Sequence, residues 1–267
     1  MGAKELFDAG NLSGAIGQVT QDVKGSPRDL RSRIFLFELL CFTAEFARAE
    51  RQLDAIAQTS GEVMVEMGIQ VYRDVIAAEK LRHEFFKSGT GQPKFFMEPP
   101  AYAALHLQAV AKNREGRSAE VEDLLKEALQ LRAPVAGQSS GAPFAEMTDC
   151  DALVAPFLEV IAQKEYAWIP LEEIQNIEIQ APRTLRDLLW APAKVAMRGN
   201  ALGQVFLPVN YYGSNEHPND LVKLGRMTEW IALGEAFVLG MGQRSYLFDD
   251  DERPLLELRK IEFAEVT

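Results

Sequence analysis

Cysteine and histidine are scarce in this chain of 267 residues, which holds two cysteines and three histidines. Cys41 and Cys150 lie far apart, and neither has a second cysteine at the spacing of a zinc or redox motif. His83, His106 and His217 are equally scattered. The sequence therefore predicts no metal site, and two distant cysteines indicate reduced thiols and a cytoplasmic protein.

Long apolar runs and positive charge are also missing. No run approaches the ~20 residues of a membrane-spanning helix, and the first residues, MGAKELFDAGN, lack the apolar core of an export signal. The net charge is −11. Residues 1–140 hold 17 Lys and Arg against 19 Asp and Glu, whereas residues 141–267 hold 11 against 20. Because an acidic second half repels phosphate backbones, we expect no nucleic acid partner, and the lack of a long apolar run predicts no membrane partner.

The first half of the chain predicts stacked pairs of helices. Residues 6–16 and 40–50 resemble each other at an offset of 34 residues, with Leu6 matching Leu40 and Ala15 matching Ala49. This offset is the period of tetratricopeptide repeats. Residues 61–87 predict one long helix, and residues 102–132 predict a further pair. We therefore expect a tetratricopeptide-like helical domain in residues 1–133.

The second half changes to the alternating pattern of β-strands. Residues 134–147 are rich in Pro, Gly, Ser and Ala and predict a linker. Residues 151–164 predict a short helix, and strand patterns follow. Thr184 and Asp187 have the spacing of a helix cap. The expected fold class is α+β, a helical domain followed by a small mixed β-rich domain in residues 148–267, with a bent or partly closed sheet.

Three segments imitate catalytic motifs. Residues 137–141 have the G-x-S-x-G spacing of a nucleophile elbow, but the proline-containing sequence around them does not predict the required strand and helix. Gly240 and Gly242 lack the third glycine of a dinucleotide loop and indicate a bulge or a close backbone approach. The adjacent acids 249–252 lack the alternate spacing of a calcium loop and predict a turn between strands. We therefore expect no catalysis and no cofactor.

A domain of stacked helices usually binds a peptide or helix through a few apolar anchors. The candidate anchors are aromatic residues in or beside the helices, of which we expect about two to be exposed. They are Tyr72, Phe85, Phe86, Phe95 and Tyr102. The alternative is an enzyme or small-ligand binder, in which Arg186 and Arg244 hold an anion in a pocket of the β-rich domain. Otherwise these arginines form ion pairs with Asp187 or with the acids 249–252.

Five short segments, taken together, resemble the ImpE/TagJ family of type VI secretion accessory proteins. They are FFMEPPAY (95–102), YAWIPLEEI (166–174), APRTLRDLLWAPA (181–193), GRMTEW (225–230) and GMGQR (240–244). Their order and spacing agree with the family over nearly the whole chain, and RDLLWAPA and GMGQR are the most distinctive.

The resemblance implies a tetratricopeptide-like N-terminal domain and no enzymatic activity. It also implies a cytoplasmic role at the contractile sheath, as an adaptor that binds an N-terminal helix of the small sheath subunit. Members of the family are further linked to the ClpV-type ATPase that disassembles contracted sheaths. The partners we expect are therefore the small sheath subunit and the ATPase.

Overall fold

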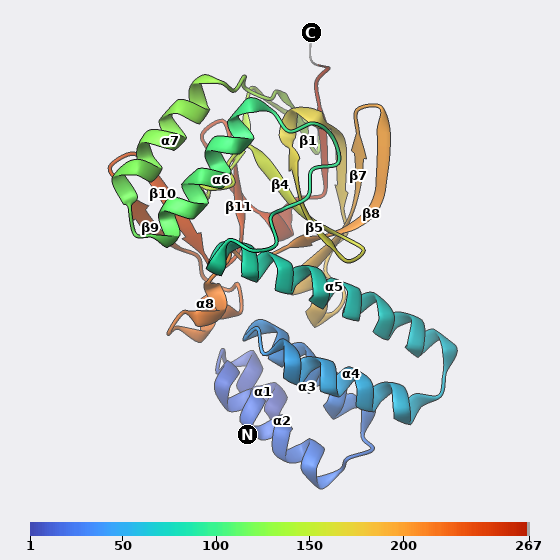
Figure 1. Cartoon of the computed structure of the whole chain (residues 1–267). Coiled ribbons are helices and arrows are strands. Elements are labelled where there is room, and N and C mark those ends of the chain that lie inside the picture. The colour runs from blue at the N-terminus through green and yellow to red at the C-terminus, as the bar shows by residue number, and fades with distance from the viewer. Residues whose placement is uncertain (266–267) are drawn as a thin grey trace.

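The structure, a computed structural model, describes residues 1–265, apart from the side chains of residues 200 and 201. Helices occupy the first half of the chain and strands occupy most of the second (Figure 1). The helices are α1 (Ala3–Asp8), α2 (Leu12–Gly25), α3 (Leu30–Phe42), α4 (Phe46–Ser60), α5 (Val63–Ser88), α6 (Ala101–Arg114), α7 (Ser118–Gln130) and α8 (Asp220–Lys223). The strands are β1 (Gly137–Ser139), β2 (Ala142–Phe144), β3 (Met147–Asp149), β4 (Phe157–Ala162), β5 (Glu165–Pro170), β6 (Ile174–Ile179), β7 (Trp190–Met197), β8 (Asn200–Pro208), β9 (Glu229–Leu233), β10 (Phe237–Met241), β11 (Ser245–Phe248), β12 (Asp251–Pro254) and β13 (Lys260–Phe263).

Helices α1 to α4 form two pairs whose turns occupy equivalent places. Gly10 and Ala44 stand in these turns, 34 residues apart, with φ angles of 81° and 52°. Ala15 and Ala49 are both fully buried, so each pair has the close contact that a small residue permits. Beyond these pairs, α5 is a single helix of 26 residues, and α6 and α7 pack against strands. The α+β class is confirmed, whereas the tetratricopeptide-like assignment stays a prediction.

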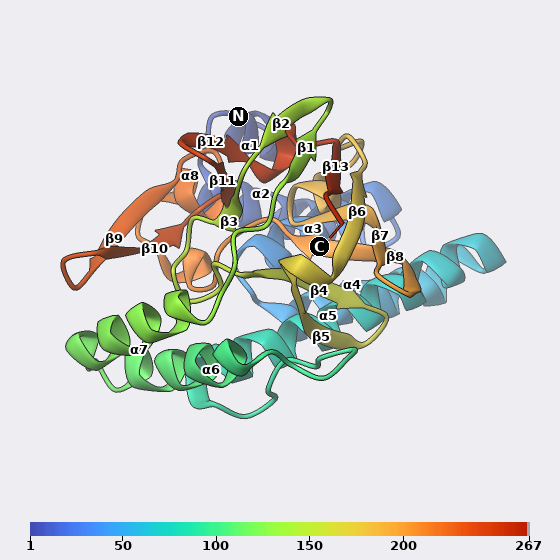
Figure 2. The ribbon, with the colours of Figure 1, turned by 90° about the horizontal axis from the view of Figure 1, so that it is seen from above.

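Eleven of the strands belong to two sheets that share one hydrophobic core. The eight-stranded sheet has the order β2-β1-β13-β6-β7-β8-β4-β5, and every neighbouring pair is antiparallel. A three-stranded sheet, β12-β11-β3, contributes Tyr246 and Phe248 to the same core as Leu158 and Ile177. The hairpin β9–β10 forms a separate two-stranded sheet. Figure 2 shows this hairpin extending away from the larger sheet.

The short helix that we expected in residues 151–164 is wrong, because the structure has strand β4 there. The residues before it form turns, and Phe157–Ala162 pair with β5 and β8. Leu158 packs into the core between the sheets, whereas Phe157 packs against α6 and α7 on the opposite face. A strand that is buried on both faces reads as a continuous apolar run, which periodicity alone cannot distinguish from a buried helix.

The segment 134–147, expected to be a linker, instead holds a β-hairpin. Strands β1 and β2 pair with each other, and β1 also pairs with β13 near the far end of the chain. The two-residue turn is Ser140–Gly141, with φ angles of 51° and 88°. Positive φ at both positions is typical of the tight turns that suit a twisted hairpin. The small residues of this segment therefore allow the tight turn and the pairing of the strands, although their composition alone predicted a linker.

Buried contacts join the two halves of the chain. Phe85 on α5 and Tyr102 on α6 share a hydrophobic cluster with Phe157 and Trp168 of the sheet. In Figure 1, α5 runs between the N-terminal helices and the sheet. The division into residues 1–133 and 148–267 stays a prediction, because shared packing does not show whether either part folds alone.

Candidate functional site

Two buried arginines from opposite halves of the chain share one carboxylate. Glu159 on β4 accepts a hydrogen bond of 2.9 Å from Nε of Arg82 on α5, and its second oxygen pairs with Arg244, which follows β10. Arg82 also pairs with Glu79 at 2.9 Å, and Arg244 pairs with Asp149. All five side chains are almost fully buried. The network therefore ties the longest helix to the central strands.

Aromatic side chains complete the hydrogen bonding of this network. The Tyr166 hydroxyl donates to Glu159 at 2.5 Å, and the Trp190 indole N–H donates to Glu79 at 3.2 Å. Burial alone would raise the pKa of Glu159, but Arg244 and Arg82 outweigh it and lower that pKa to about 2. Because each charged group has partners, the network holds the helix and the strands together, and none of its groups is available as a free acid or base.

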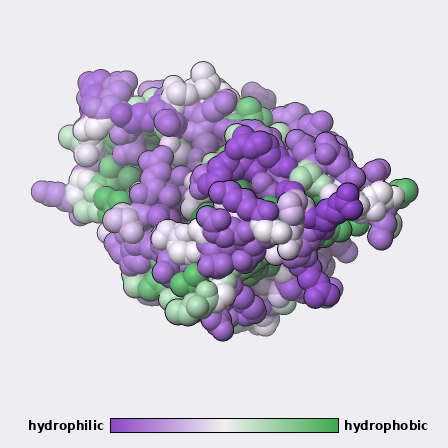
Figure 3. All heavy atoms as spheres, turned by 90° about the horizontal axis from the view of Figure 1, so that it is seen from below, coloured by the Kyte–Doolittle hydropathy of each residue, from purple (hydrophilic) through white to green (hydrophobic). Residues whose placement is uncertain are grey.

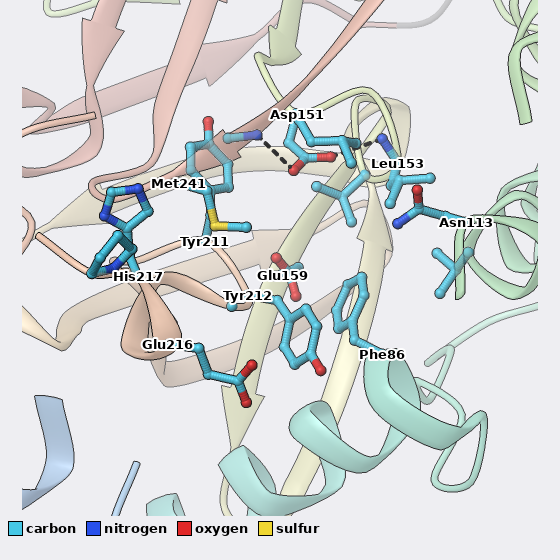
Figure 4. A pocket seen from close by; sticks show the side chains of 16 residues that line it. Phe86, Asn113, Asp151, Leu153, Glu159, Tyr211, Tyr212, Glu216, His217 and Met241 are labelled. Atoms are coloured by element: carbon cyan, nitrogen blue, oxygen red, sulfur yellow. Dashed lines mark hydrogen bonds between the residues drawn. The ribbon is translucent and has the colours of Figure 1, made fainter. Parts of the chain in front are cut away.

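A cavity of about 390 Å³ lies beside this network, between α6, β4, β10 and the segment 211–218 (Figure 4). Phe86 and Tyr212 form one wall, with stacked rings whose centroids lie 4.8 Å apart. Asp151, in the turn before β4, and Glu159 on β4 line the cavity, and Glu216 faces it from the side opposite Asp151. The volume is within the range of small-ligand sites.

The three imitations of catalytic motifs have structural roles. Ser139 is buried in β1 and its turn leads into another strand, so no nucleophile elbow forms. A side chain at Gly240 would lie 2.2 Å from the Tyr211 ring, and one at Gly242 would lie 2.0 Å from the Met227 carbonyl oxygen. The acids 249–252 form the turn and strand after β11, as predicted. Within residues 1–265, His, Cys, Asp and Glu side chains form no group of three that could hold a metal ion.

The five candidate anchors do not form an exposed set. Phe85, Phe86 and Tyr102 are buried, and Tyr72 and Phe95 are half-buried, so the expectation of about two exposed rings is wrong. Phe85 and Tyr102 fill the contact between helices and sheet, because large apolar side chains are needed where a helix covers strands. Phe86 alone of the five lines the cavity. Their role in binding a protein stays a prediction that the burial does not favour.

The two arginines of the alternative anion site lie in different surroundings. Arg244 is 1% exposed and its guanidinium is held by Asp149 and Glu159. Arg186 lies 3.3 Å from Glu38 and stacks over the Tyr72 ring. The alternative of ion pairs with Asp187 or with the acids 249–252 does not hold either, because among residues 1–265 their carboxylate partners are Glu38, Asp149 and Glu159. Each already has a carboxylate partner, so the structure does not assemble an anion site from them.

An exposed apolar stripe runs along the start of α5. We did not predict it as a surface from the sequence. Its residues are Val63, Met64, Met67 and Val71, which are 70%, 76%, 60% and 44% exposed. The spacing of i, i+1, i+4 and i+8 places them on one side of the helix. Their helical periodicity predicted the long helix but not which of its faces is exposed. The two exposed methionines were the available signal, because methionine is common on surfaces that bind helices.

Most of the chain matches a known secretion component. The sequence profile of the ImpE protein family matches residues 141–262. The type VI secretion system accessory component TagJ of Pseudomonas aeruginosa is 34% identical over 98% of this chain and 90% of its own length. The chain belongs to the ImpE/TagJ family. The resemblance drawn from five short segments is thereby confirmed.

A solved structure extends the ImpE/TagJ comparison to the fold. The crystal structure of protein VPA1032 from Vibrio parahaemolyticus superposes with a TM-score of 0.90, and the match covers 99% of this chain and 98% of that one. Its sequence is 22% identical, so the likeness concerns the fold alone. Within residues 1–265, no helix is long and apolar enough to cross a membrane.

Acid should weaken this ImpE/TagJ fold through His106 on α6. The ring is 5% exposed, and its Nδ1 lies 2.9 Å from the Leu153 carbonyl oxygen. Burial lowers its pKa to about 4, below the unfolded value of about 6.5. Between pH 6.5 and 4 the unfolded chain binds a proton at His106 and the folded protein does not. The folded state is therefore most stable above pH 6.5 and loses this contribution as the pH falls towards 4. The loss amounts to about 3 kcal/mol.

Urea unfolding at pH 7, 5.5 and 4 measures this contribution when the protein is compared with its His106→Gln variant. Glutamine keeps an N–H donor for Leu153 but does not titrate. We expect the variant to be less stable at pH 7 and to lose much less stability towards pH 4. A difference between the two proteins that stays constant with pH would contradict the assignment, since Glu79 and Glu159 titrate in both.

Proposed function

We propose that this chain is a non-catalytic adaptor of a type VI secretion system. It binds an amphipathic helix of the small sheath subunit and links the contractile sheath to its ClpV-type disassembly ATPase in the cytoplasm. Membership of the ImpE/TagJ family supports the accessory role. The observation that carries the binding step is the apolar stripe on α5.

The stripe has the features of a helix-binding surface. It lies where α5 extends beyond the sheet, so one side of the helix is uncovered (Figure 1). An amphipathic helix presents apolar anchors at the same helical spacing and could lie along it. Glu62 and Glu66 are exposed beside the stripe, which suits a partner with basic residues next to its apolar face. Figure 3 shows the molecule from below, and this face is mostly hydrophilic, with hydrophobic groups in separate areas.

The test is a titration of the full chain against a fluorescent peptide from the start of the small sheath subunit. A peptide of about 20 residues gives a helix roughly 30 Å long. The double variant Met64→Glu/Met67→Glu should bind at least about tenfold more weakly, because it places two charges in an apolar contact. The double variant Leu129→Glu/Leu131→Glu is the matched control, since these leucines are also exposed, at 51% and 53%.

Salt and the ATPase provide two further tests. Affinity should fall only modestly between 0.1 M and 1 M salt, since the contact is mainly apolar and screening acts only on the charges of Glu62 and Glu66 beside it. Equal binding by the Met64→Glu/Met67→Glu variant, or a steep loss of affinity with salt, would contradict the stripe as the site.

Co-sedimentation of the purified ATPase with sheaths tests the linking role. We expect more ATPase in the pellet when this protein is added.

A further inference from the structure

The cavity beside the buried network has acidic groups and no free basic partner. Asp151 and Glu216 line it, and no Lys or Arg side chain is among its lining residues within the described part of the chain. His217 also lines it, 3.4 Å from Glu229. Glu159 reaches the cavity as well, but Arg82 and Arg244 already neutralise it. Among the described residues, Asp151 and Glu216 are therefore the carboxylates of this cavity that no ion pair neutralises.

Asp151 is the more informative of the two because it is buried. Its side chain accepts backbone hydrogen bonds of 2.9 Å from Leu153 and 3.1 Å from Gly240, and the residue is 9% exposed. No basic side chain lies within ion-pair distance of it among residues 1–265. Burial, and then the neighbouring Asp149, raise its pKa to about 7. A carboxylate in such a place gains strongly from a cation that enters the cavity.

The remaining walls favour an aliphatic stem behind the cation. Val154, Leu239 and Met241 supply aliphatic surface, and Figure 4 shows Met241 beside Tyr211, with Asp151 close by. The aromatic wall of Phe86 and Tyr212 lies next to Glu159. Acidic groups at two sides, with apolar surface between them, match a compact organic cation on a short chain.

We propose that this cavity binds an ammonium or guanidinium group on a short aliphatic stem. The group comes from a small free amine or from a lysine or arginine side chain of a protein partner. The cation lies against the buried Asp151, the stem contacts the aliphatic wall, and Glu216 adds negative charge from the opposite side of the cavity. This site is separate from the stripe on α5, so it does not depend on the function proposed above.

The charge of Asp151 makes binding depend on pH. A cation binds the carboxylate form, so affinity should be about tenfold higher at pH 8 than at pH 6 when the carboxyl titrates with a pKa of about 7. His217 lines the same cavity, and the variant His217→Gln separates its contribution. The charged groups that face Asp151 or the same cavity are Asp149, Glu159, Arg82, Arg244, Glu216 and His217.

Calorimetric titration of the full chain tests the proposal with three probes. Agmatine represents a free guanidinium compound, and N-acetyl-arginine amide represents an arginine side chain on a peptide. Butyrate, an anion of similar stem length, is the control. We expect one or both cations to bind more tightly at pH 8 than at pH 6, and butyrate not to bind. The cation that binds more tightly identifies the source.

Two variants connect binding to the carboxylates. Asp151→Asn should weaken the bound cation by at least about tenfold, and Glu216→Gln, at the exposed rim, should weaken it by a smaller factor. Asp250→Asn, in the turn after β11, is the matched control and should bind like the unmodified chain. If Asp151→Asn does not fold, the loss caused by Glu216→Gln still decides the matter. No binding of either cation, equal binding of butyrate, or unchanged binding by both carboxylate variants would overturn the proposal.

Discussion

Replacing Arg244 with methionine is expected to lower the free energy of unfolding by about 3–5 kcal/mol. The substitution leaves Asp149 without a cation and leaves Glu159 with Arg82 alone. It also removes a hydrogen bond of 3.2 Å to the Pro208 carbonyl oxygen. Because Asp149 and Glu159 are both almost fully buried, water cannot replace the lost guanidinium. Urea unfolding at pH 7, followed by circular dichroism, measures the change.

A second substitution distinguishes the lost charge from the lost packing. In the double variant Arg244→Met/Asp149→Asn the uncompensated carboxylate is absent, so part of the stability should return. The difference in stability between Arg244→Met and the unmodified chain should also become smaller as the pH is lowered. Burial already raises the pKa of Asp149, and losing Arg244 raises it further, so the carboxyl is neutralised by protonation. Arg253→Met is the matched control, since Arg253 forms an ion pair at the surface with Asp251. That control should cost less than about 0.5 kcal/mol. Equal losses at positions 244 and 253 would show that the buried network does not stabilise the fold.

Replacing Trp190 with alanine is expected to cost about 3–5 kcal/mol. A large aromatic ring near a proline in the segment RDLLWAPA predicts a side chain that fills the core of the β-rich domain. The structure places it instead between the sheet and the N-terminal helices, where it is 3% exposed and packs near Tyr72. Its indole N–H donates to Glu79. Alanine therefore leaves a cavity in the core and removes one hydrogen-bond donor from the buried Glu79 carboxylate.

Thermal and urea unfolding of three variants measure the separate effects at Trp190. Trp190→Phe keeps most of the volume but loses the N–H, so we expect it to cost less than Trp190→Ala. Trp230→Ala is the control, because Trp230 is 37% exposed on the β9–β10 hairpin. It should be closer to the unmodified chain in stability. A Trp190→Ala variant that melts like the unmodified chain but no longer binds the sheath peptide would identify Trp190 as a binding residue.

The sequence determined the features that depend on neighbouring residues. The long helix α5 and the cap of Thr184 with Asp187 are as predicted, and the turns at Gly10 and Gly116 fall at glycines with positive φ. Each of these depends on contacts within a few residues, such as a positive φ or a side chain that accepts from the next turn. The close approach at Gly240, in β10, and at Gly242, directly after it, was predictable because glycines in a β-rich segment often mark such an approach. The family was also recognisable, since its distinctive segments keep their order along the chain.

Only the tertiary structure decided the features that join distant residues. The pairing of β1 with β13 converted an expected linker into part of a sheet. Burial on both faces made β4 a strand, although its sequence suits a helix equally well. The partners of Glu159 lie on α5 and after β10, 77 and 85 residues away, so no local pattern could indicate that this one acid would hold two arginines. The same holds for Asp151, whose cavity is formed by segments that meet only when the helices pack against the sheet.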